Sequence, residues 1–287
     1  MKDYQFESTE HGAILTKVLT SPTHAVIPEY AEGLPVYAVG KYAFEGQEQL
    51  QSVHFPATIQ EIQSHAFYNC TNLEHLILDA GVRAVADGAF KSCRALHRIT
   101  VNGSEHLEQF LTDCTLEIVV TMHLEHGETA VLLFPEYDYI YEEMVQPRGV
   151  KMVTYGSGSF YRVCFYRSQI DFAQYDRAFA RAIPNDTTET LVTIALLRLQ
   201  YPYRLCDSAR ERYLTYITEH CCDAAKLAIK QRDSAKLELI LRYELPDQNG
   251  IQQLILFSNE EEFPEATSML MDYRLAKFGS RRARFVL

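Results

Sequence analysis

The sequence predicts an α+β chain of more than one domain. A short β-solenoid comes first, followed by a small antiparallel β element and an all-α stack of helical hairpins. The pair Ala-Phe recurs at residues 43–44, 66–67 and 89–90, so successive copies lie 23 residues apart. From about residue 171 the apolar residues change to the helical period of about 3.6. A fixed repeat of this length predicts stacked coils, because no single coil can bury its apolar face alone.

The apolar residues around the Ala-Phe pairs keep the same phase from coil to coil. Each coil predicts a short strand, a turn and a return arm, with strands stacked about 4.8 Å apart in a parallel ladder. Phe44, Phe67 and Phe90 are expected to form an aromatic spine. The predicted core columns are Val36, Ile59 and Val82; Val39, Ile62 and Val85; Leu50, Leu73 and Leu96; Val53, Leu76 and Ile99; and Phe55, Leu78 and Val101.

The full repeat has a characteristic order of residues. It reads Ile-x-x-Ile-x-x-x-Ala-Phe, a small polar or Cys position, and then Leu-x-x-Leu-x-Leu, over residues 59–78 and 82–101, with a weaker copy from residue 36. This order resembles the BspA-like leucine-rich repeats of many bacterial and some protist proteins. The resemblance covers about a third of the chain. It implies a leucine-rich-repeat fold and a tendency to bind proteins, with residues 13–18 as part of a cap and 26–28 as a degenerate first coil.

The cysteines predict a reduced, cytoplasmic protein. There are seven of them, an odd number, and none forms a C-x-x-C pair. Cys70 and Cys93 occupy the same position of the repeat, where a redox or metal pair is one interpretation. A small buried residue in each coil is the favoured one. The polar, acidic N-terminus lacks the features of a secretory signal, which agrees with a cytoplasmic location.

The outward strand positions give the predicted binding site. By strand alternation they form two columns across the sheet, and no catalytic, cofactor-binding or metal-binding residue is predicted. Their mixture of imidazole, guanidinium and hydroxyl groups around one isoleucine suits a small protein or peptide epitope. An ordinary solvated face is the alternative. The predicted partner-binding residues are Ser52, His75 and Arg98 in one column and His54, Ile77 and Thr100 in the other.

The rest of the chain is predicted to form two further domains. The predicted division is 1–103 for the repeats, 104–168 for a β-rich connecting segment and 169–287 for a helical domain. In the middle segment, residues 104–111 predict a short helix, and 116–124, 129–134, 149–155 and 160–166 predict strands. The glycines of residues 155–159 predict a hairpin turn rather than a nucleotide-binding loop, since no helix is expected to follow.

The C-terminal segment carries helical periodicity throughout. Asp171 and the Thr187–Thr188 pair are expected to cap the first two helices, and a third begins near Asp207. Four shorter helices at 222–231, 234–243, 251–258 and 264–277 are predicted to pair as two helix-turn-helix units. Their packing loosely resembles the ankyrin-type stack, although the T-P-L-H motif is missing.

The leading functional hypothesis is a non-catalytic protein–protein interaction module of the bacterial leucine-rich-repeat type. The net charge of −11 disfavours nucleic-acid binding, and no long apolar stretch predicts a membrane span. No cofactor is expected, and the oligomeric state is left open. One alternative is a secreted or surface effector or adhesion protein that leaves the cell by a non-classical route. Another is an enzyme with its site between the middle segment and the helical domain, and its candidate residues would be Tyr161, Arg162, Cys164, Tyr175 and Asp176.

Overall fold

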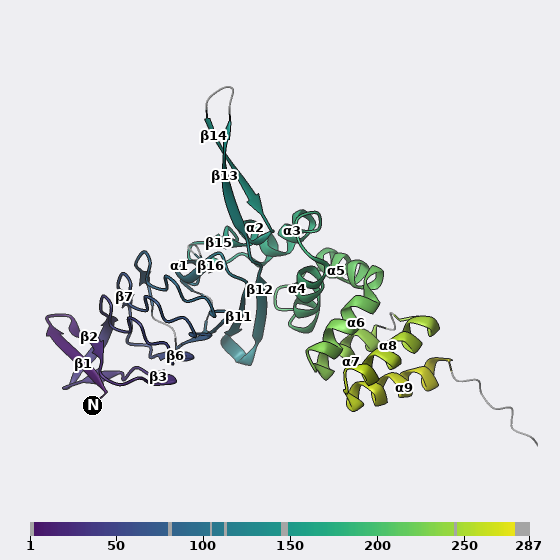
Figure 1. Cartoon of the computed structure of the whole chain (residues 1–287), viewed down its shortest axis with the longest axis horizontal. Coiled ribbons are helices and arrows are strands. Elements are labelled where there is room, and N and C mark those ends of the chain that lie inside the picture. Colours follow the sequence, from purple (N-terminus) through teal and green to yellow (C-terminus); the bar gives the residue numbers. More distant parts are fainter. Residues whose placement is uncertain are drawn as a thin grey trace, which may run out of the picture. The chain divides into compact units, whose positions relative to one another are not determined.

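The computed structural model describes residues 3–79, 82–103, 105–111, 114–144, 149–243 and 246–278. The chain divides into two compact units, residues 1–185 (unit 1) and 186–287 (unit 2). Unit 1 contains the strands of the repeats and a short helical region, and unit 2 is built from helices (Figure 1). The finer division at residues 103 and 168 stays a prediction.

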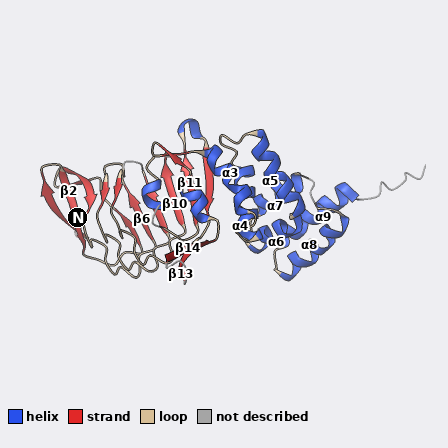
Figure 2. Ribbon diagram, turned by 90° about the horizontal axis from the view of Figure 1, so that it is seen from above, coloured by secondary structure: helices blue, strands red, loops and turns tan. Residues whose placement is uncertain are grey.

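The repeat region is a β-solenoid, as the sequence predicts, and two sheets run along it (Figure 2). In the first sheet the strands from β3 to β11 are parallel, and the last strand is antiparallel to its neighbour. Its order is β3 (His24–Val26), β6 (Ser52–Phe55), β8 (His75–Leu78), β10 (Arg98–Asn102), β11 (Ile118–His123) and β12 (Thr129–Phe134). The second sheet contains β1 (Tyr4–Thr9), β2 (Gly12–Val18), β5 (Leu34–Val39), β7 (Glu61–Ile62) and β9 (Ala84–Val85), with β4 (Tyr30–Ala31) beside β5.

The length of the coil changes at both ends of the ladder. Ser52 pairs with His75, and His75 pairs with Arg98, so these two steps have the length of the sequence repeat. The coil from His24 to its partner Ser52 is longer, because the short β4–β5 hairpin is inserted into it. The coil from Arg98 to its partner Val119 is shorter than the repeat. The parallel ladder therefore continues to β11, although the phase of the repeat ends after β10.

The predicted core columns lie in the interior of the solenoid. Every member is buried except Val85, which is half-buried at the end of the second sheet. The aromatic spine is also present: the ring centroids of Phe44 and Phe67 are 4.6 Å apart, and those of Phe67 and Phe90 are 5.1 Å apart. Both pairs are stacked, with interplanar angles of 22° and 8°. Stacking between identical positions follows from the parallel register.

The residue before each Ala-Phe pair adopts the left-handed backbone conformation. The φ angles of Tyr42, His65 and Gly88 are 60°, 59° and 67°. A left-handed residue lets the arm turn sharply towards the interior, and only glycine adopts it without strain. The coils therefore share a backbone geometry at a position where the residue type differs from coil to coil.

The end of unit 1 differs from the sequence prediction in three places. Residues 160–162, predicted as strand, belong to helix α2 (Gly158–Arg162), and only Phe165–Tyr166 of the predicted strand forms one, β15. A helix therefore does open after the glycines of residues 155–159. A β-carbon at Gly158 would collide with the carbonyl oxygen of Pro135, so the helix can start there only with glycine. A strand that was not predicted, β13 (Asp138–Met144), forms a hairpin with β14 (Gly149–Tyr155).

The remaining elements of unit 1 fit the predictions more closely. Helix α1 (Glu108–Leu111) lies in the predicted helical segment, of which Ser104 lies outside the described residues. A 3₁₀ turn, η1 (Glu125–Gly127), joins β11 to β12. The short strand β16 (Gln169–Ile170) pairs with β15. The Asp171 side chain then accepts a hydrogen bond from the Gln174 amide and caps α3 (Phe172–Ala182), as predicted.

Unit 2 has the predicted helical hairpins. Thr187 caps its first helix by accepting a hydrogen bond from the Thr190 amide. Helices α6 and α7 pack against each other, and so do α8 and α9, as predicted. Among the described residues, no helix has the length and apolar character that crossing a membrane requires. The helices are α4 (Thr188–Gln200), α5 (Asp207–Glu219), α6 (Cys221–Lys230), α7 (Ser234–Arg242), α8 (Gln248–Glu260) and α9 (Pro264–Phe278).

Candidate functional site

The candidate site is the outward face of the first sheet. Strands β6 and β8 alternate between half-buried and buried residues, so every second side chain points away from the core. The register places Ser52, His75 and Arg98 in one row across the strands. His54, Ile77 and Thr100 form the next row, as the sequence predicts. We call the surface formed by these six residues the outer face.

Side chains on the outer face are held by hydrogen bonds that cross between strands. The Nε2 atom of His75 lies 2.9 Å from Oγ1 of Thr100, which links the two predicted rows. The Oγ of Ser52 lies 2.8 Å from Nδ1 of His24 on the preceding strand. Because each ring is anchored to a neighbouring strand, its polar edge has a fixed direction.

A third row of polar residues, Asp79 and Asn102, completes this hydrogen-bond network, and these two residues were not predicted from the sequence. Asp79 Oδ2 lies 2.8 Å from Nε2 of His54, and Asp79 Oδ1 accepts a hydrogen bond of 3.2 Å from Nδ2 of Asn102. Asp79 and Asn102 lie 23 residues apart, at the ends of β8 and β10. Extending the two predicted columns by one strand alternation would have found them. The carboxylate fixes the orientation of the His54 ring.

The outer face also carries a positive charge, and apolar side chains lie on it and beside it. Arg98 is exposed, and Ile77 is half-buried in the row of His54. Val26 pairs with His54 on the other side, and 62% of it is exposed. The arrangement therefore offers two imidazole rings held in place and an exposed guanidinium around a small apolar strip.

Acid is expected to weaken the fold through His75. Burial lowers the pKa of His75 below its ordinary value of 6.5, and the charges of Arg98 and His97 add to the shift. As the pH falls through 6.5, His75 therefore takes up a proton in the unfolded chain before it does so in the folded one. The free energy of unfolding decreases over the pH range between 6.5 and the lower pKa of the folded state. His75→Gln keeps a hydrogen-bonding group near Thr100 and cannot titrate. We expect a smaller loss of stability for this variant between about pH 7.5 and about pH 5.5, measured by urea unfolding. Identical pH profiles for the two proteins would contradict this.

The residues of the alternative catalytic hypothesis do come together, within unit 1, on and beside α2 and α3. The rings of Tyr161 and Tyr175 are 4.7 Å apart, and the hydroxyl of Tyr175 donates a 2.6 Å hydrogen bond to the Leu133 carbonyl. Arg162 and Asp176 are 7% and 2% exposed. The guanidinium of Arg162 donates to main-chain carbonyls. The Arg162 guanidinium and the Tyr175 hydroxyl are thus engaged with the protein's own main chain.

Cys164 is expected to be an unreactive thiol. It is buried, its Sγ donates a 3.3 Å hydrogen bond to the Phe160 carbonyl, and burial, with the charge of Asp171, raises its pKa to about 12. Iodoacetamide reacts with thiolates. On the native protein at neutral pH we expect it to modify the exposed Cys206 and to leave Cys164 unmodified, as read by peptide mass spectrometry. Labelling of Cys164 at the rate of Cys206 would contradict this, and unfolding in urea provides the control that Cys164 can be detected.

The repeat cysteines have a structural position. The Sγ of Cys70 donates a 3.0 Å hydrogen bond to the Phe44 carbonyl, and the Sγ of Cys93 donates a 3.2 Å bond to the Phe67 carbonyl. Each thiol therefore ties its coil to the preceding one. Among the described residues, no group of three or more His, Cys, Asp or Glu side chains is placed to hold a metal ion.

Comparison with known proteins gives one family and several solved structures. Residues 26–123 match the model of the BspA type leucine rich repeat region, with six copies. The chain is 32% identical to a leucine rich repeat protein of T. pallidum, over 35% of this chain and 51% of that one, with a TM-score of 0.33. It is 28% identical to a leucine rich cell surface protein of Faecalibacterium prausnitzii, over 35% of this chain and 32% of that one, with a TM-score of 0.32.

A third similar structure is shorter. It is a leucine-rich repeat protein of Bacteroides capillosus, 31% identical over 35% of this chain and 78% of that one, with a TM-score of 0.33. The chain thus spans about half the length of the T. pallidum protein and about a third of that of the F. prausnitzii protein. Comparison with curated proteins gives no match.

Proposed function

Residues 26–123 belong to the BspA-type leucine-rich repeats, and from this premise we propose that the chain is a non-catalytic module that binds a protein or peptide partner. We place the binding site on the outer face, at Ser52, His54, His75, Ile77, Arg98 and Thr100. Leucine-rich repeats typically mediate protein binding, which supports the general class. The choice of surface rests on the cross-strand hydrogen-bond network.

The network carries the proposal because it orders the surface before a partner arrives. Binding costs free energy when side chains must be immobilised, at about 0.5–1.5 kcal/mol for each flexible one. On the outer face, His54 is already held by Asp79 and His75 by Thr100. These two rings therefore lose little side-chain freedom on binding.

The chemistry of the outer face favours an acidic or hydroxyl-bearing segment with a small apolar side chain. The exposed Arg98 supplies a planar donor that suits a carboxylate. Ile77 and Val26 supply an apolar contact on either side of His54. An interface of standard size, about 800 Å² per partner, would extend beyond these strands to neighbouring loops.

A pull-down with the full chain tests the site. The variant His75→Ala, Ile77→Ala, Arg98→Ala is compared with the wild type after quantitative mass spectrometry of retained proteins. Retention of a specific partner is expected to fall at least about tenfold, the effect of losing about 1.4 kcal/mol.

The matched control lies on the second sheet of the same coils. Tyr37→Ala, Glu61→Ala, Arg83→Ala likewise changes three residues, and it removes one aromatic ring and two charges. The proposal expects this control to retain partners like the wild type. Equal retention by the outer-face variant and the wild type would move the binding site elsewhere.

The proposal that the module is non-catalytic draws on the cluster around Cys164. A nucleophilic cysteine needs a lowered pKa and access, and Cys164 has a raised pKa and is buried. The neighbouring Arg162 is engaged by main-chain carbonyls rather than directed to an open site. The cluster is better explained as packing of α2 and α3 against β12.

A reducing, cytoplasmic location is part of the proposal. All seven cysteines are free thiols, as expected where disulfides do not persist. The alternative of a surface or secreted protein has support from the F. prausnitzii relative, which is described as a cell surface protein. Fractionation of cells followed by immunoblotting separates the two, since a surface protein would be found with the envelope or the medium.

A further inference from the structure

The return arm of a coil is the stretch that carries its Ala-Phe pair. Main-chain hydrogen bonds join the three arms that carry residues 43–44, 66–67 and 89–90, here called the first, second and third arms. The amide of Phe44 donates to the carbonyl of Ala66 at 2.8 Å, and the amide of Phe67 donates to the carbonyl of Ala89 at 2.8 Å. Two residues further on, Gly46 donates to Tyr68 at 2.9 Å, and Asn69 donates to Lys91 at 3.0 Å. Each arm thus offers two amides to the next arm, at positions i and i+2.

The third arm, residues 86–93, presents the same two amides at its open edge. By the repeat these are the amides of Phe90 and Ser92. No carbonyl of the described residues accepts a hydrogen bond from either of them. Likewise, no main-chain hydrogen bond joins this arm to the described residues of 105–116. The sheet ladder continues to β11, but on the arm side the described residues of the next coil do not pair with the third arm.

The shorter last coil explains the open edge. This coil, from Arg98 to its partner Val119, contains fewer residues than the two coils before it and lacks an Ala-Phe pair. Its aromatic residue, Phe110, lies 5.9 Å from Phe90 at an interplanar angle of 39°, so the parallel stacking of the spine ends there. Because the described residues of this last coil do not pair with the third arm, space remains between the coil and the arm.

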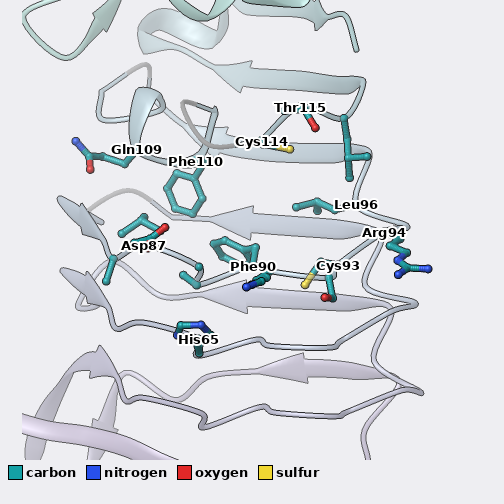
Figure 3. Close-up of a pocket in the computed structure, with 17 residues that line it drawn as sticks. His65, Asp87, Phe90, Cys93, Arg94, Leu96, Gln109, Phe110, Cys114 and Thr115 are labelled. Carbon is teal, nitrogen blue, oxygen red and sulfur yellow. The ribbon is translucent and has the colours of Figure 1, made fainter. Parts of the chain in front are cut away.

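A cavity of about 470 Å³ occupies this space. Its walls include the apolar side chains of Phe90, Leu96, Phe110 and Leu116. Figure 3 shows Phe90 and Phe110 on facing levels of the solenoid, with Cys93 and Cys114 further along the same gap. The volume falls in the range of about 300–1,000 Å³ that is typical of ligand sites.

We propose that this cavity, the arm-edge cavity, binds a short peptide segment that takes the place of the next arm. The segment would accept hydrogen bonds from the Phe90 and Ser92 amides through two of its carbonyls, at positions j and j+2. It would place a small residue and an aromatic residue against the apolar walls. This is the recognition of a peptide by main-chain pairing at an open edge, with side-chain pockets that supply the specificity.

The rim of the arm-edge cavity defines the charge of the peptide. Among the described residues that line it, Lys91 and Arg94 are exposed, and Asp87 is the acidic one. The cations outnumber the carboxylate, so a peptide with an acidic residue after its aromatic one is favoured over a basic peptide. The first arm has this composition, since residues 42–47 read Tyr-Ala-Phe-Glu-Gly-Gln.

Fluorescence anisotropy with a labelled peptide tests the arm-edge cavity. The probe is the peptide of residues 42–47 with both ends blocked and a fluorophore on a linker, titrated with the full chain. We expect saturable binding in the micromolar range. The all-D peptide, which has the same composition and charge, is expected to bind at least about tenfold more weakly, because its carbonyls cannot meet both amides.

Two variants locate the binding. Ala86→Leu adds a larger side chain to the cavity wall and is expected to weaken binding at least about tenfold. Lys91→Glu changes only the exposed rim, so it reports on the site even if Ala86→Leu fails to fold. It is expected to weaken binding several-fold, with Lys41→Glu on the first arm as the control that leaves binding unchanged.

The outcomes separate this proposal from the outer-face proposal. The variant at His75, Ile77 and Arg98 is expected to bind the probe like the wild type, whichever partner the outer face takes. Absence of saturable binding, equal binding of the L and D peptides, or binding unaffected by both Ala86→Leu and Lys91→Glu would overturn the arm-edge site.

Discussion

Replacing Phe67 by Ala is expected to lower the free energy of unfolding of unit 1 by about 3–5 kcal/mol, the largest effect of any single change in the repeats. Phe67 is fully buried and lies between Phe44 and Phe90 in the spine, and the ring centroid of Phe55 is 5.7 Å away in a T-shaped contact. Truncation leaves a cavity that the stacked coils cannot close, because the spacing of the coils is fixed by the main-chain ladder.

Hydrogen exchange read by mass spectrometry is the suitable measurement, because far-UV circular dichroism is dominated by the helices of unit 2. The amides of β6, β8 and β10 are expected to lose protection in the Phe67→Ala variant. Tyr42→Ala is the control: it removes an aromatic ring from the neighbouring arm, but 41% of Tyr42 is exposed, and a small effect is expected. Similar losses of protection in the two variants would show that the spine does not hold the coils together.

Replacing Arg162 by Met is expected to destabilise unit 1 by at least about 3 kcal/mol. The guanidinium is buried and donates to the carbonyls of Cys114, at 3.1 Å, and of Leu116 and Pro135. Methionine fills much of the same volume but leaves these carbonyls without their donor, at a cost of about 1–3 kcal/mol for each buried group.

Arg162→Lys sharpens this prediction. Lysine keeps the charge, but its single ammonium group cannot reach three carbonyls in the directions that a planar guanidinium allows, so a substantial loss remains expected. Arg177→Met is the control, since Arg177 is exposed on α3. The measurement is again hydrogen exchange, now at β11 and β12. Protection like that of the wild type in Arg162→Met would show that water replaces the guanidinium at little cost.

The apolar columns could be predicted from the sequence because each column needs only contact between neighbouring coils. Val53, Leu76 and Ile99 are buried by the same side-chain alternation that the sequence displays. The predicted outward residues are outward in the structure for the same reason. Asp79 and Asn102 occupy the same position in successive repeats and follow the same alternation, but they lie where the strands end and the predicted columns stopped one step before them.

The closing part of unit 1 could not be predicted in this way. Arg162 meets the Cys114 carbonyl across 48 residues of chain, and no local period marks such a contact. The start of α2 depends on Gly158 lying against Pro135, which the sequence around Gly158 does not indicate. From the sequence, Arg162 entered only the alternative catalytic hypothesis, whereas the fold uses its guanidinium to satisfy main-chain carbonyls.

The repeat by itself determined the solenoid, its core columns and its outward face, because burial in stacked coils follows a local, periodic rule. Only the tertiary structure decided how the solenoid ends: the ladder continues to β11 on the sheet side, and the arm side opens at Phe90 and Ser92 among the residues that the structure describes. The ends of a stack have no repeat beyond them to impose the register. Contacts between distant segments determine them, and these contacts also create the arm-edge cavity.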